Sequence, residues 1–323
     1  MNCPKVDNPT LSELSELIPE MVTSSIASNT LKRYAHGYRT WNAWCTKHPE
    51  ADTLPVSSFQ LILFIISIVQ SKGSFGKIES VFYGLKWVHD ALNLPSPFMS
   101  TTVKLIKEAA KRILAKPVRK KQPITPYMLR KLAKQSRNEI RNLRSLTLTI
   151  LAYAGFLRFD EVSRLKWQDV FFEEDYFKLF IDHSKGDQHK VGEWVYIART
   201  REKTCPYRIL RRYIRTTKPK KGTFLFRGLV KKKTGYVLSA NNKPISYNTA
   251  RDIVMKAVES IGMDKRNFGT HSFRRGGAST AANAGINDRL FKKHGRWRSE
   301  AAKDGYVSEC LEEKLSVTRS LGI

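Results

Sequence analysis

A chain of 323 residues exceeds the usual size of one domain, and its net charge of +28 with a pI near 10 predicts a polyanionic partner. The longest apolar run, residues 61–69, is too short to span a bilayer, and residues 1–20 lack the basic and apolar regions of a secretory signal. The four scattered cysteines include no Cys-x-x-Cys pair, so we expect reduced thiols in an intracellular protein, without a disulfide framework or a zinc site.

The positive charge lies mostly in the second part of the chain. Residues 1–116 hold 13 Lys and Arg against 9 Asp and Glu, whereas residues 117–323 hold 44 against 20. An anionic membrane is the alternative partner, but membrane binding normally uses one amphipathic helix with a continuous basic stripe. Because the basic residues here are spread over many elements, the pattern favours nucleic acid.

The first part of the chain is predicted to be a small helical bundle. Residues 1–20 are polar and expected to be flexible. A helix then begins near Ser28, and its apolar stripe indicates a core face more than a base-stacking surface. That stripe comprises Leu31, Tyr34, Tyr38, Trp41 and Trp44. Further helices are predicted over residues 59–69, 75–92 and 100–114, so the bundle spans residues 21–116.

A linker is predicted over residues 117–124. Pro117 and Pro123 disfavour a helix there, and the basic run Arg119, Lys120, Lys121 favours solvent. The run fits an ordinary solvated linker, and equally a segment that lies along a phosphate backbone.

The second part of the chain, residues 125–323, is predicted to be mainly helical with a small antiparallel β-sheet. Helices are expected over residues 125–135, 140–154, 206–216, 246–262, 269–284 and 288–294, followed by an amphipathic segment over 307–321. Two strands, residues 171–182 and 191–198, are rich in aromatic and β-branched residues. The turn between them carries Lys185.

The stretch 269–306 holds the residues best suited to chemistry. His271 and Arg274 are three apart and would share a helix face, and Tyr306 follows Trp297 by nine residues. A guanidinium suits phosphate oxygens, an imidazole moves protons, and a tyrosine can be a covalent nucleophile. Taken alone, these residues also fit a solvated face and a packed tyrosine.

A second pair, Arg158 and Glu161, follows an apolar helix and its turn. On spacing alone a surface ion pair is favoured, although Glu161 could orient Arg158 as a supporting carboxylate. The chain has no Walker loop, no His-Glu-x-x-His motif and no acidic cluster suited to magnesium. We therefore expect no metal and no cofactor.

Together these residues resemble the tyrosine recombinase (phage-integrase-like) family, in the family's own order. The matching motifs are RFDE, HSKG, HSFR and GRW, and then the tyrosine. The resemblance covers about residues 125–320, and it implies a catalytic domain preceded by a helical core-binding (SAM-like) domain. Some members have tryptophan at the Trp297 position, so the nearby His294 is expected to be structural. The sequence RRGGAST departs from the commoner His-Thr after Arg274 and resembles eukaryotic mobile elements of the Crypton or DIRS type.

The resemblance also implies a role for each matching residue. Tyr306 would attack the scissile phosphodiester and form a 3′-phosphotyrosine. Arg158 and Arg274 would hold the non-bridging oxygens, and Glu161 would support them. Lys185 would protonate the leaving 5′-oxygen, His271 would take or share the tyrosine proton, and Trp297 would donate its indole N–H to the phosphate.

Double-stranded DNA is the implied partner, clamped by two domains within a tetramer on two sites; no membrane or small-molecule substrate is expected. The segment after Tyr306 would dock on a neighbouring protomer or fold back in cis. The protein is expected to be intracellular, and nuclear if the source is eukaryotic. The candidate DNA-binding residues are Arg33, Arg39, Lys104, Lys107, Lys111, Arg119, Lys120, Lys121 and Arg275. The alternatives are a type IB topoisomerase-like enzyme and a non-catalytic DNA-binding protein derived from a recombinase.

Overall fold

The chain divides into two compact units. The computed structural model describes residues 8–117, 119–135, 139–182 and 191–321, without the side chain of residue 317. The N-terminal unit comprises residues 1–118 and the C-terminal unit residues 119–323. The division falls inside the segment 117–124 that was expected to be the linker. Residues 119–124 pack with the C-terminal unit, where Ile124 is buried and its N–H donates to the Ser272 carbonyl at 3.0 Å.

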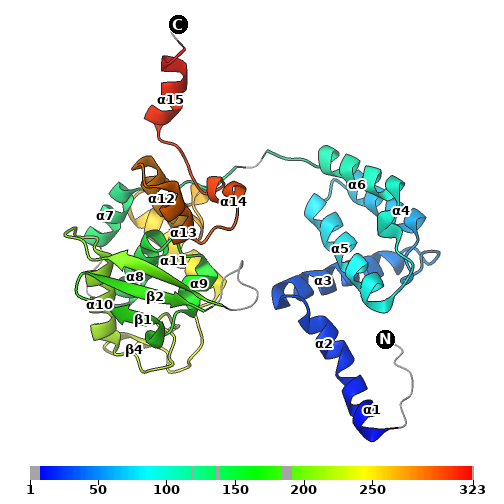
Figure 1. The fold of residues 1–323 in the computed structure, drawn as a ribbon, viewed down its shortest axis with the longest axis horizontal. Helices are drawn as coiled ribbons and strands as arrows, with labels where there is room; N and C mark the ends of the chain where they lie inside the picture. The colour runs from blue at the N-terminus through cyan, green and yellow to red at the C-terminus, as the bar shows by residue number, and fades with distance from the viewer. Residues whose placement is uncertain (1–7, 118, 136–138, 183–190, 322–323) are drawn as a thin grey trace. The chain divides into compact units, whose positions relative to one another are not determined.

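The N-terminal unit is all helical (Figure 1). Its helices are α1 (Pro9–Glu16), α2 (Ile18–Ser24), α3 (Ser28–Cys45), α4 (Ser58–Gln70), α5 (Phe75–Leu92) and α6 (Thr101–Ile113). Trp41 of the predicted stripe is fully buried and Trp44 packs against the same core, so the stripe is a core face as predicted. No helix was predicted for residues 1–20, which were expected to be polar and flexible, but most of residues 9–20 are helical. They lie in α1 and α2, where Asn8 caps the first helix and none of the side chains is buried.

Two glycines explain how α3 packs against α5. A Cβ at Gly37 of α3 would overlap the Ser80 carbonyl, and a Cβ at Gly84 of α5 would lie 2.7 Å from the Tyr34 carbonyl oxygen. The two backbones therefore approach more closely than side chains would allow. This contact supports the core in which α4 also packs against α6.

The C-terminal unit is mainly helical, with two small antiparallel sheets. Its helices are α7 (Pro126–Gln135), α8 (Ile140–Ala154), α9 (Phe159–Arg164), α10 (Pro206–Thr217), α11 (Tyr247–Ser260), α12 (Ser272–Asn283), α13 (Asp288–Gly295), α14 (Glu300–Asp304) and α15 (Leu311–Arg319). The strands are β1 (Val170–Phe172), β2 (Tyr176–Ile181), β3 (Glu193–Ala198), β4 (Leu229–Lys232) and β5 (Gly235–Leu238). The predicted fold class, mainly α with a small antiparallel sheet, is confirmed.

The first sheet has the order β1-β2-β3, with Leu179 opposite Val195. Alternate residues of β2 are buried, because one face of the sheet covers the core and the other carries Trp194 and Tyr196 in solvent. The first predicted strand is in fact two strands, β1 and β2, because Glu173, Glu174 and Asp175 form a turn between them. The turn that carries Lys185 lies outside the described residues. The hairpin β4–β5 was not predicted.

Helix α8 is the central element of the C-terminal unit, and nine of its fifteen residues are buried. One face packs on α10 through Leu143, Leu148 and Leu151. A different face meets α12, where a Cβ at Gly277 would overlap the Tyr153 carbonyl and a Cβ at Gly276 would overlap that of Ile124. The two glycines that follow Arg275 therefore stay helical, and they let α12 sit directly on α8 and on the linker.

Candidate active site

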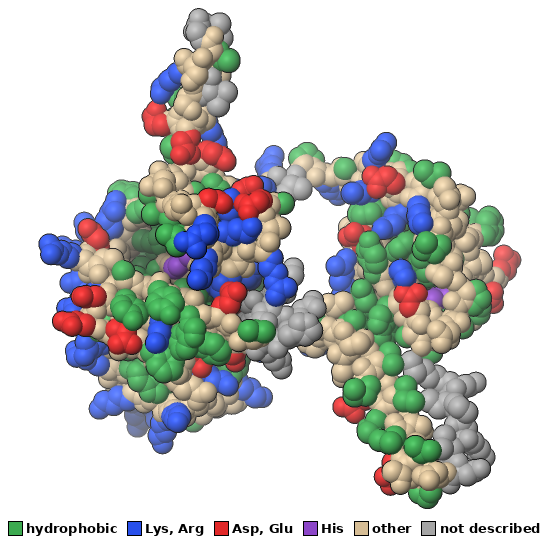
Figure 2. All heavy atoms as spheres, in the orientation of Figure 1, with side chains coloured by type: hydrophobic (Ala, Val, Ile, Leu, Met, Phe, Trp, Pro, Cys, Tyr) green, Lys and Arg blue, Asp and Glu red, His purple; other side chains and the backbone are tan. Residues whose placement is uncertain are grey.

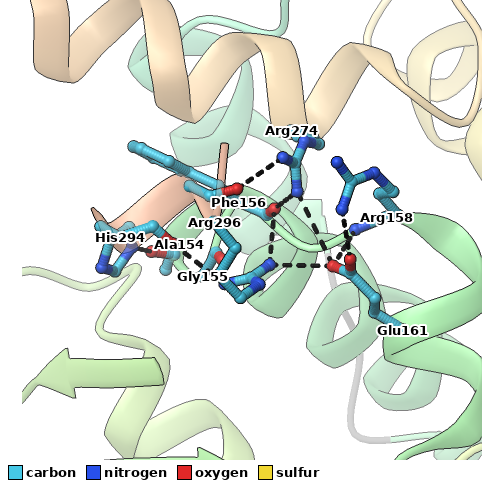
Figure 3. Close-up of polar contacts among 9 residues, drawn as sticks. Ala154, Gly155, Phe156, Arg158, Glu161, Arg274, His294 and Arg296 are labelled. Carbon is cyan, nitrogen blue, oxygen red and sulfur yellow. Dashed lines mark hydrogen bonds and ion pairs between the residues drawn. The ribbon is translucent and has the colours of Figure 1, made fainter. Parts of the chain in front are cut away.

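Glu161 lies at the centre of a group of three arginines (Figure 3). The nearest is Arg158, which precedes α9 in an extended conformation. Its backbone N–H donates to Glu161 Oε2 at 2.8 Å and its guanidinium donates to Oε1 at 2.6 Å. The Glu161 side chain is only 1% exposed, so the surface ion pair favoured by spacing alone is wrong. Glu161 is buried because Arg274 of α12 and Arg296, which follows α13, also reach its carboxylate (Figure 3).

The other two arginines reach Glu161 from elements far along the chain. Arg296 donates to Oε2 at 2.8 Å, and an Arg274 nitrogen lies 3.7 Å from the same oxygen. Burial alone would raise the pKa of Glu161, but the charges of Arg296, Arg274 and Arg158 outweigh it and hold that pKa below its usual value. With three guanidiniums around one carboxylate, the group keeps a net positive charge suited to an anion.

Arg274, in the first turn of α12, is fully buried. It donates to the Phe156 carbonyl and, at 2.7 Å, to the Gly295 carbonyl. Burial, followed by repulsion from Arg158, lowers its pKa to about 10, so it stays charged at neutral pH. Its guanidinium carbon lies 4.7 Å from the ring centre of Tyr306 and 5.1 Å from that of Trp297.

Arg296 was not among the site residues predicted from the sequence. It follows α13 with a φ of 54°, the left-handed region that favours glycine. Besides Glu161, its guanidinium donates to the carbonyls of Gly155, Phe156 and His294 at 2.9–3.2 Å. These four bonds hold the backbone in a conformation that costs an arginine about 1–3 kcal/mol. The one available signal was an arginine at the end of a predicted helix, directly before Trp297.

Tyr306 follows the short helix α14 and packs against Trp297, with ring centres 5.7 Å apart. Its segment is held to α12 by Ser279, whose hydroxyl accepts the Ser308 N–H at 3.0 Å. His271, at the start of α12, is exposed, and its ring centre lies 6.3 Å from that of Tyr306. Trp297 is 5% exposed, and its indole N–H is buried with no acceptor among the described residues.

His294 takes a different place from the other site residues. Its Nε2 lies 2.8 Å from the Ala154 carbonyl oxygen, and its ring packs edge-on against Phe156. Burial lowers the pKa of this imidazole. His294 therefore supports the turn that carries the Gly155 and Phe156 carbonyls, as a structural residue would.

The structure thus brings together the predicted Arg158, Glu161, His271, Arg274, Trp297 and Tyr306. No three His, Cys, Asp or Glu side chains in the described part of the chain lie close enough to hold a metal ion. Likewise, no helix in the described ranges is long and apolar enough to cross a bilayer.

Comparison with known proteins identifies the family. A model described as the phage integrase family matches residues 122–309, more than half of the chain. The chain belongs to the phage integrase family. Membership confirms the predicted class of activity, the breakage and rejoining of DNA strands by a tyrosine recombinase. The narrower resemblance to Crypton or DIRS-type elements stays a prediction.

Individual relatives agree with this family. An integrase/recombinase xerD homolog of Selenomonas ruminantium is 28% identical over 292 residues, which cover 88% of this chain and 83% of that protein. A structure of the XerH site-specific recombinase bound to a palindromic difH substrate has a TM-score of 0.63 at 14% identity, covering 96% of this chain and 84% of that one. A Tn1549 transposon integrase in complex with transposon right end DNA has a TM-score of 0.61 at 14% identity, covering 95% and 99%. The two structures share the fold.

The candidate DNA-binding residues of this phage integrase family member lie in several places. Arg33, Arg39, Lys104, Lys107 and Lys111 are on α3 and α6, where Lys107 lies over the Phe82 and Tyr83 rings. Arg119 and Lys120 are exposed, and the Lys121 ammonium donates to the Arg266 carbonyl. Arg275 is half-buried and donates to the Lys121 carbonyl at 2.9 Å, so it also ties the linker to α12.

Proposed function

We propose that this chain is a site-specific DNA recombinase that cuts and rejoins duplex DNA through a 3′-phosphotyrosine at Tyr306, without a metal. The observation that carries the proposal is the position of Tyr306 beside a buried, charged Arg274, 4.7 Å from its ring centre. An anion drawn to the arginine group would lie next to the tyrosine hydroxyl.

The arginines would stabilise the transition state. The Tyr306 oxygen attacks phosphorus, and charge builds on the two non-bridging oxygens, which Arg158 and Arg274 would hold. Removing one such donor typically lowers the rate by about 10²–10³. Both guanidiniums are already oriented by Glu161 and by the Phe156 and Gly295 carbonyls. They therefore need little reorganisation when the phosphate arrives.

Protons move at both ends of the reaction. The Tyr306 hydroxyl loses its proton to His271, which is exposed on the same side of α12. The bond from phosphorus to the 5′-oxygen breaks, and Lys185 would protonate that oxygen as it leaves. Trp297 would donate its unpaired indole N–H to the phosphate, which would satisfy a buried donor. One phosphoester is exchanged for another, so rejoining needs no energy source.

Recombination requires several protomers on two DNA sites, and we propose a tetramer joined in part by the segment after Tyr306. Leu311 and Leu315 of α15 are exposed, and no described side chain of α15 is buried. The C-terminal unit also has an apolar cleft of about 680 Å³, lined by Phe156, Trp194, Ala281, Ile286, Leu290 and Phe291 among others. This cleft would accept α15 of a neighbouring protomer.

The double variant Leu311→Ser with Leu315→Ser tests this assembly. We expect it to cleave a single site normally but to lose the concentration-dependent pairing of two sites. A single-turnover cleavage assay and a two-colour DNA pairing assay separate the two steps. Unchanged pairing would contradict exchange of α15, and relaxation of supercoils by a wild-type monomer would indicate a topoisomerase instead. Because the substrate is cellular DNA, we place the enzyme inside the cell, and in the nucleus if the source is eukaryotic.

The target site is accessible to a direct experiment. Nicked genomic fragments are incubated with the protein in excess EDTA and denatured in SDS, and the protein-linked DNA is sequenced. The proposal predicts adducts at a recurrent sequence. Adducts spread over unrelated sequences would contradict site specificity, and tight binding with no adducts would favour a non-catalytic DNA-binding protein.

A further inference from the structure

Half of the net charge of the chain lies in one segment that the proposed chemistry does not use. Residues 199–243 contain fifteen Lys and Arg against a single acidic residue, Glu202, a net of +14 out of +28. The segment comprises α10, the following turn and the β4–β5 hairpin. Figure 2 shows Lys and Arg side chains along the edge of the C-terminal unit on which Figure 1 labels α10 and β4.

Helix α10 presents these charges as an ordered row. Tyr207, Ile209, Leu210 and Tyr213 are buried on one side of the helix. Arg208, Arg211, Arg212 and Arg215 are all exposed, at steps of three, one and three residues, so they form one outward face. The row is about 10 Å long at a rise of about 1.5 Å per residue, and Lys218, Lys220 and Lys221 extend it. We name these seven residues the α10 basic face.

The α10 basic face lies away from the candidate active site. Helix α8 packs on α10 with one face and on α12 with another, so α8 stands between them. Packed helix axes are about 8–10 Å apart, which puts the outer side of α10 roughly 20 Å beyond α12. Figure 1 likewise shows α10 and α9 on different sides of the unit. A duplex that occupies the arginine group and Tyr306 would not reach this face.

The composition of the face favours a phosphate backbone over a protein or a membrane. Val230 is the one well-exposed large apolar side chain in residues 199–243, all of which the structure describes. Protein interfaces rely on buried aromatic and apolar anchors, and membrane-binding helices insert apolar residues. The side chains of Arg212, Arg215 and Lys221 form no hydrogen bond or ion pair with any described residue, so they are available to an external anion.

We propose that the α10 basic face binds a second segment of duplex DNA through its phosphates, while the first duplex occupies the active site. This inference rests on the proposed function only in taking DNA as the substrate. The contacts would be independent of sequence, because the face offers charges in a row to a backbone that carries one negative charge per about 1.7 Å of helix axis.

The test counts the short labelled duplexes bound per protomer by sedimentation at increasing salt. The test variant is Arg212→Gln, Arg215→Gln, Lys221→Gln, and the matched control is Arg130→Gln, Lys131→Gln, Lys134→Gln, which removes the same charge from exposed positions of α7. The wild type and the control are expected to bind a second duplex per protomer. The affinity of the test variant for the second duplex should fall by about 10-fold or more. If the second duplex still binds, the slope of log affinity against log salt concentration should be smaller by about 3.

Four outcomes bear on the proposal. All three proteins should form equal amounts of covalent adduct on a nicked site, which reports the active site separately. A second duplex bound equally by the test variant would overturn the assignment of the face. Second-site binding of single-stranded RNA in preference to duplex DNA would overturn the choice of ligand. If none of the three proteins formed an adduct while binding of the second duplex still depended on the α10 basic face, the proposed chemistry would fail and this inference would stand.

Discussion

The Arg296 guanidinium donates a 2.8 Å hydrogen bond to the Glu161 carboxylate from a residue whose backbone has a φ of 54°. Glycine would adopt that backbone at little cost, so the contacts of the Arg296 side chain explain why an arginine occupies the position. By taking one oxygen of Glu161, Arg296 leaves Arg274 at 3.7 Å from the carboxylate, with its guanidinium over the Tyr306 ring. Arg296 thus positions the catalytic group without facing the tyrosine itself.

Replacement of Arg296 by glycine tests this role. The variant relieves the backbone but removes all four hydrogen bonds of the guanidinium, of which the one to the buried Glu161 charge is worth about 1.5–3 kcal/mol. Glu161 keeps Arg158 and Arg274, so we expect a loss of about 2 kcal/mol in the free energy of unfolding and a much slower covalent step. Denaturant unfolding and single-turnover cleavage measure the two effects. Arg298→Gly, at an exposed position two residues on, is the control, and equal behaviour of the two variants would contradict the role of Arg296.

His294 is expected to make stability depend on pH. Burial lowers the pKa of its imidazole below the usual 6.5. Between the folded and unfolded pKa values, His294 is therefore protonated in the unfolded chain but neutral in the folded chain. The free energy of unfolding therefore falls as the pH drops below about 6.5, toward the folded pKa. His294→Gln removes this titration and should flatten the profile between pH 7.5 and about 5.5 in denaturant unfolding. A profile as steep as that of wild type would count against it, and His36→Gln, in the N-terminal unit, is the control.

The glycine pair in α12 gives a packing prediction. A Cβ at Gly277 would overlap the Tyr153 carbonyl and the Phe156 ring, so Gly277→Ala should force α12 away from α8. Overpacking of this kind typically costs about 1–3 kcal/mol, and here it would also displace Arg274 three residues earlier. The midpoint temperature of thermal unfolding and the rate of adduct formation should both fall. Gly76→Ala in α5 is the matched helical control, because nothing lies within 4 Å of its Cβ, and it should be neutral or stabilising.

The sequence predicted most of the fold because its helices have strong apolar periodicity and clear capping signals. Helices α4, α5 and α8 begin and end within a residue or so of the expected bounds. The hairpin β4–β5 was missed because each strand has only four residues, two of those in β4 are lysines, and neither strand alternates apolar and polar residues. Helices α1 and α2 were missed because the segment was judged by its polar composition, although Leu11, Leu14, Ile18 and Met21 recur at three- and four-residue steps; these side chains are exposed.

The candidate site was predictable where order and spacing matched a family, and not where the contacts are tertiary. His271, Arg274, Trp297 and Tyr306 could be selected from one stretch of sequence. The burial of Glu161 depends on a turn and two distant helices, so the spacing of residues on α9 could not predict it. Arg296 pairs with a residue 135 positions away, so no local pattern could assign it. Lys185 stays a prediction, because it lies outside the described residues.

The identity of the nucleophile tests the proposed chemistry most directly. Nicked duplex is incubated with the wild type, Tyr306→Phe and Tyr247→Phe in excess EDTA, and the DNA-linked peptide is identified by mass spectrometry. Tyr247 is the fitting control, since its hydroxyl lies 3.5 Å from that of Thr270, beside His271. We expect a phosphodiester on Tyr306, no adduct from Tyr306→Phe despite DNA affinity close to wild type, and normal adducts from Tyr247→Phe. An adduct on any other residue, or one that survives Tyr306→Phe, would contradict the proposed chemistry.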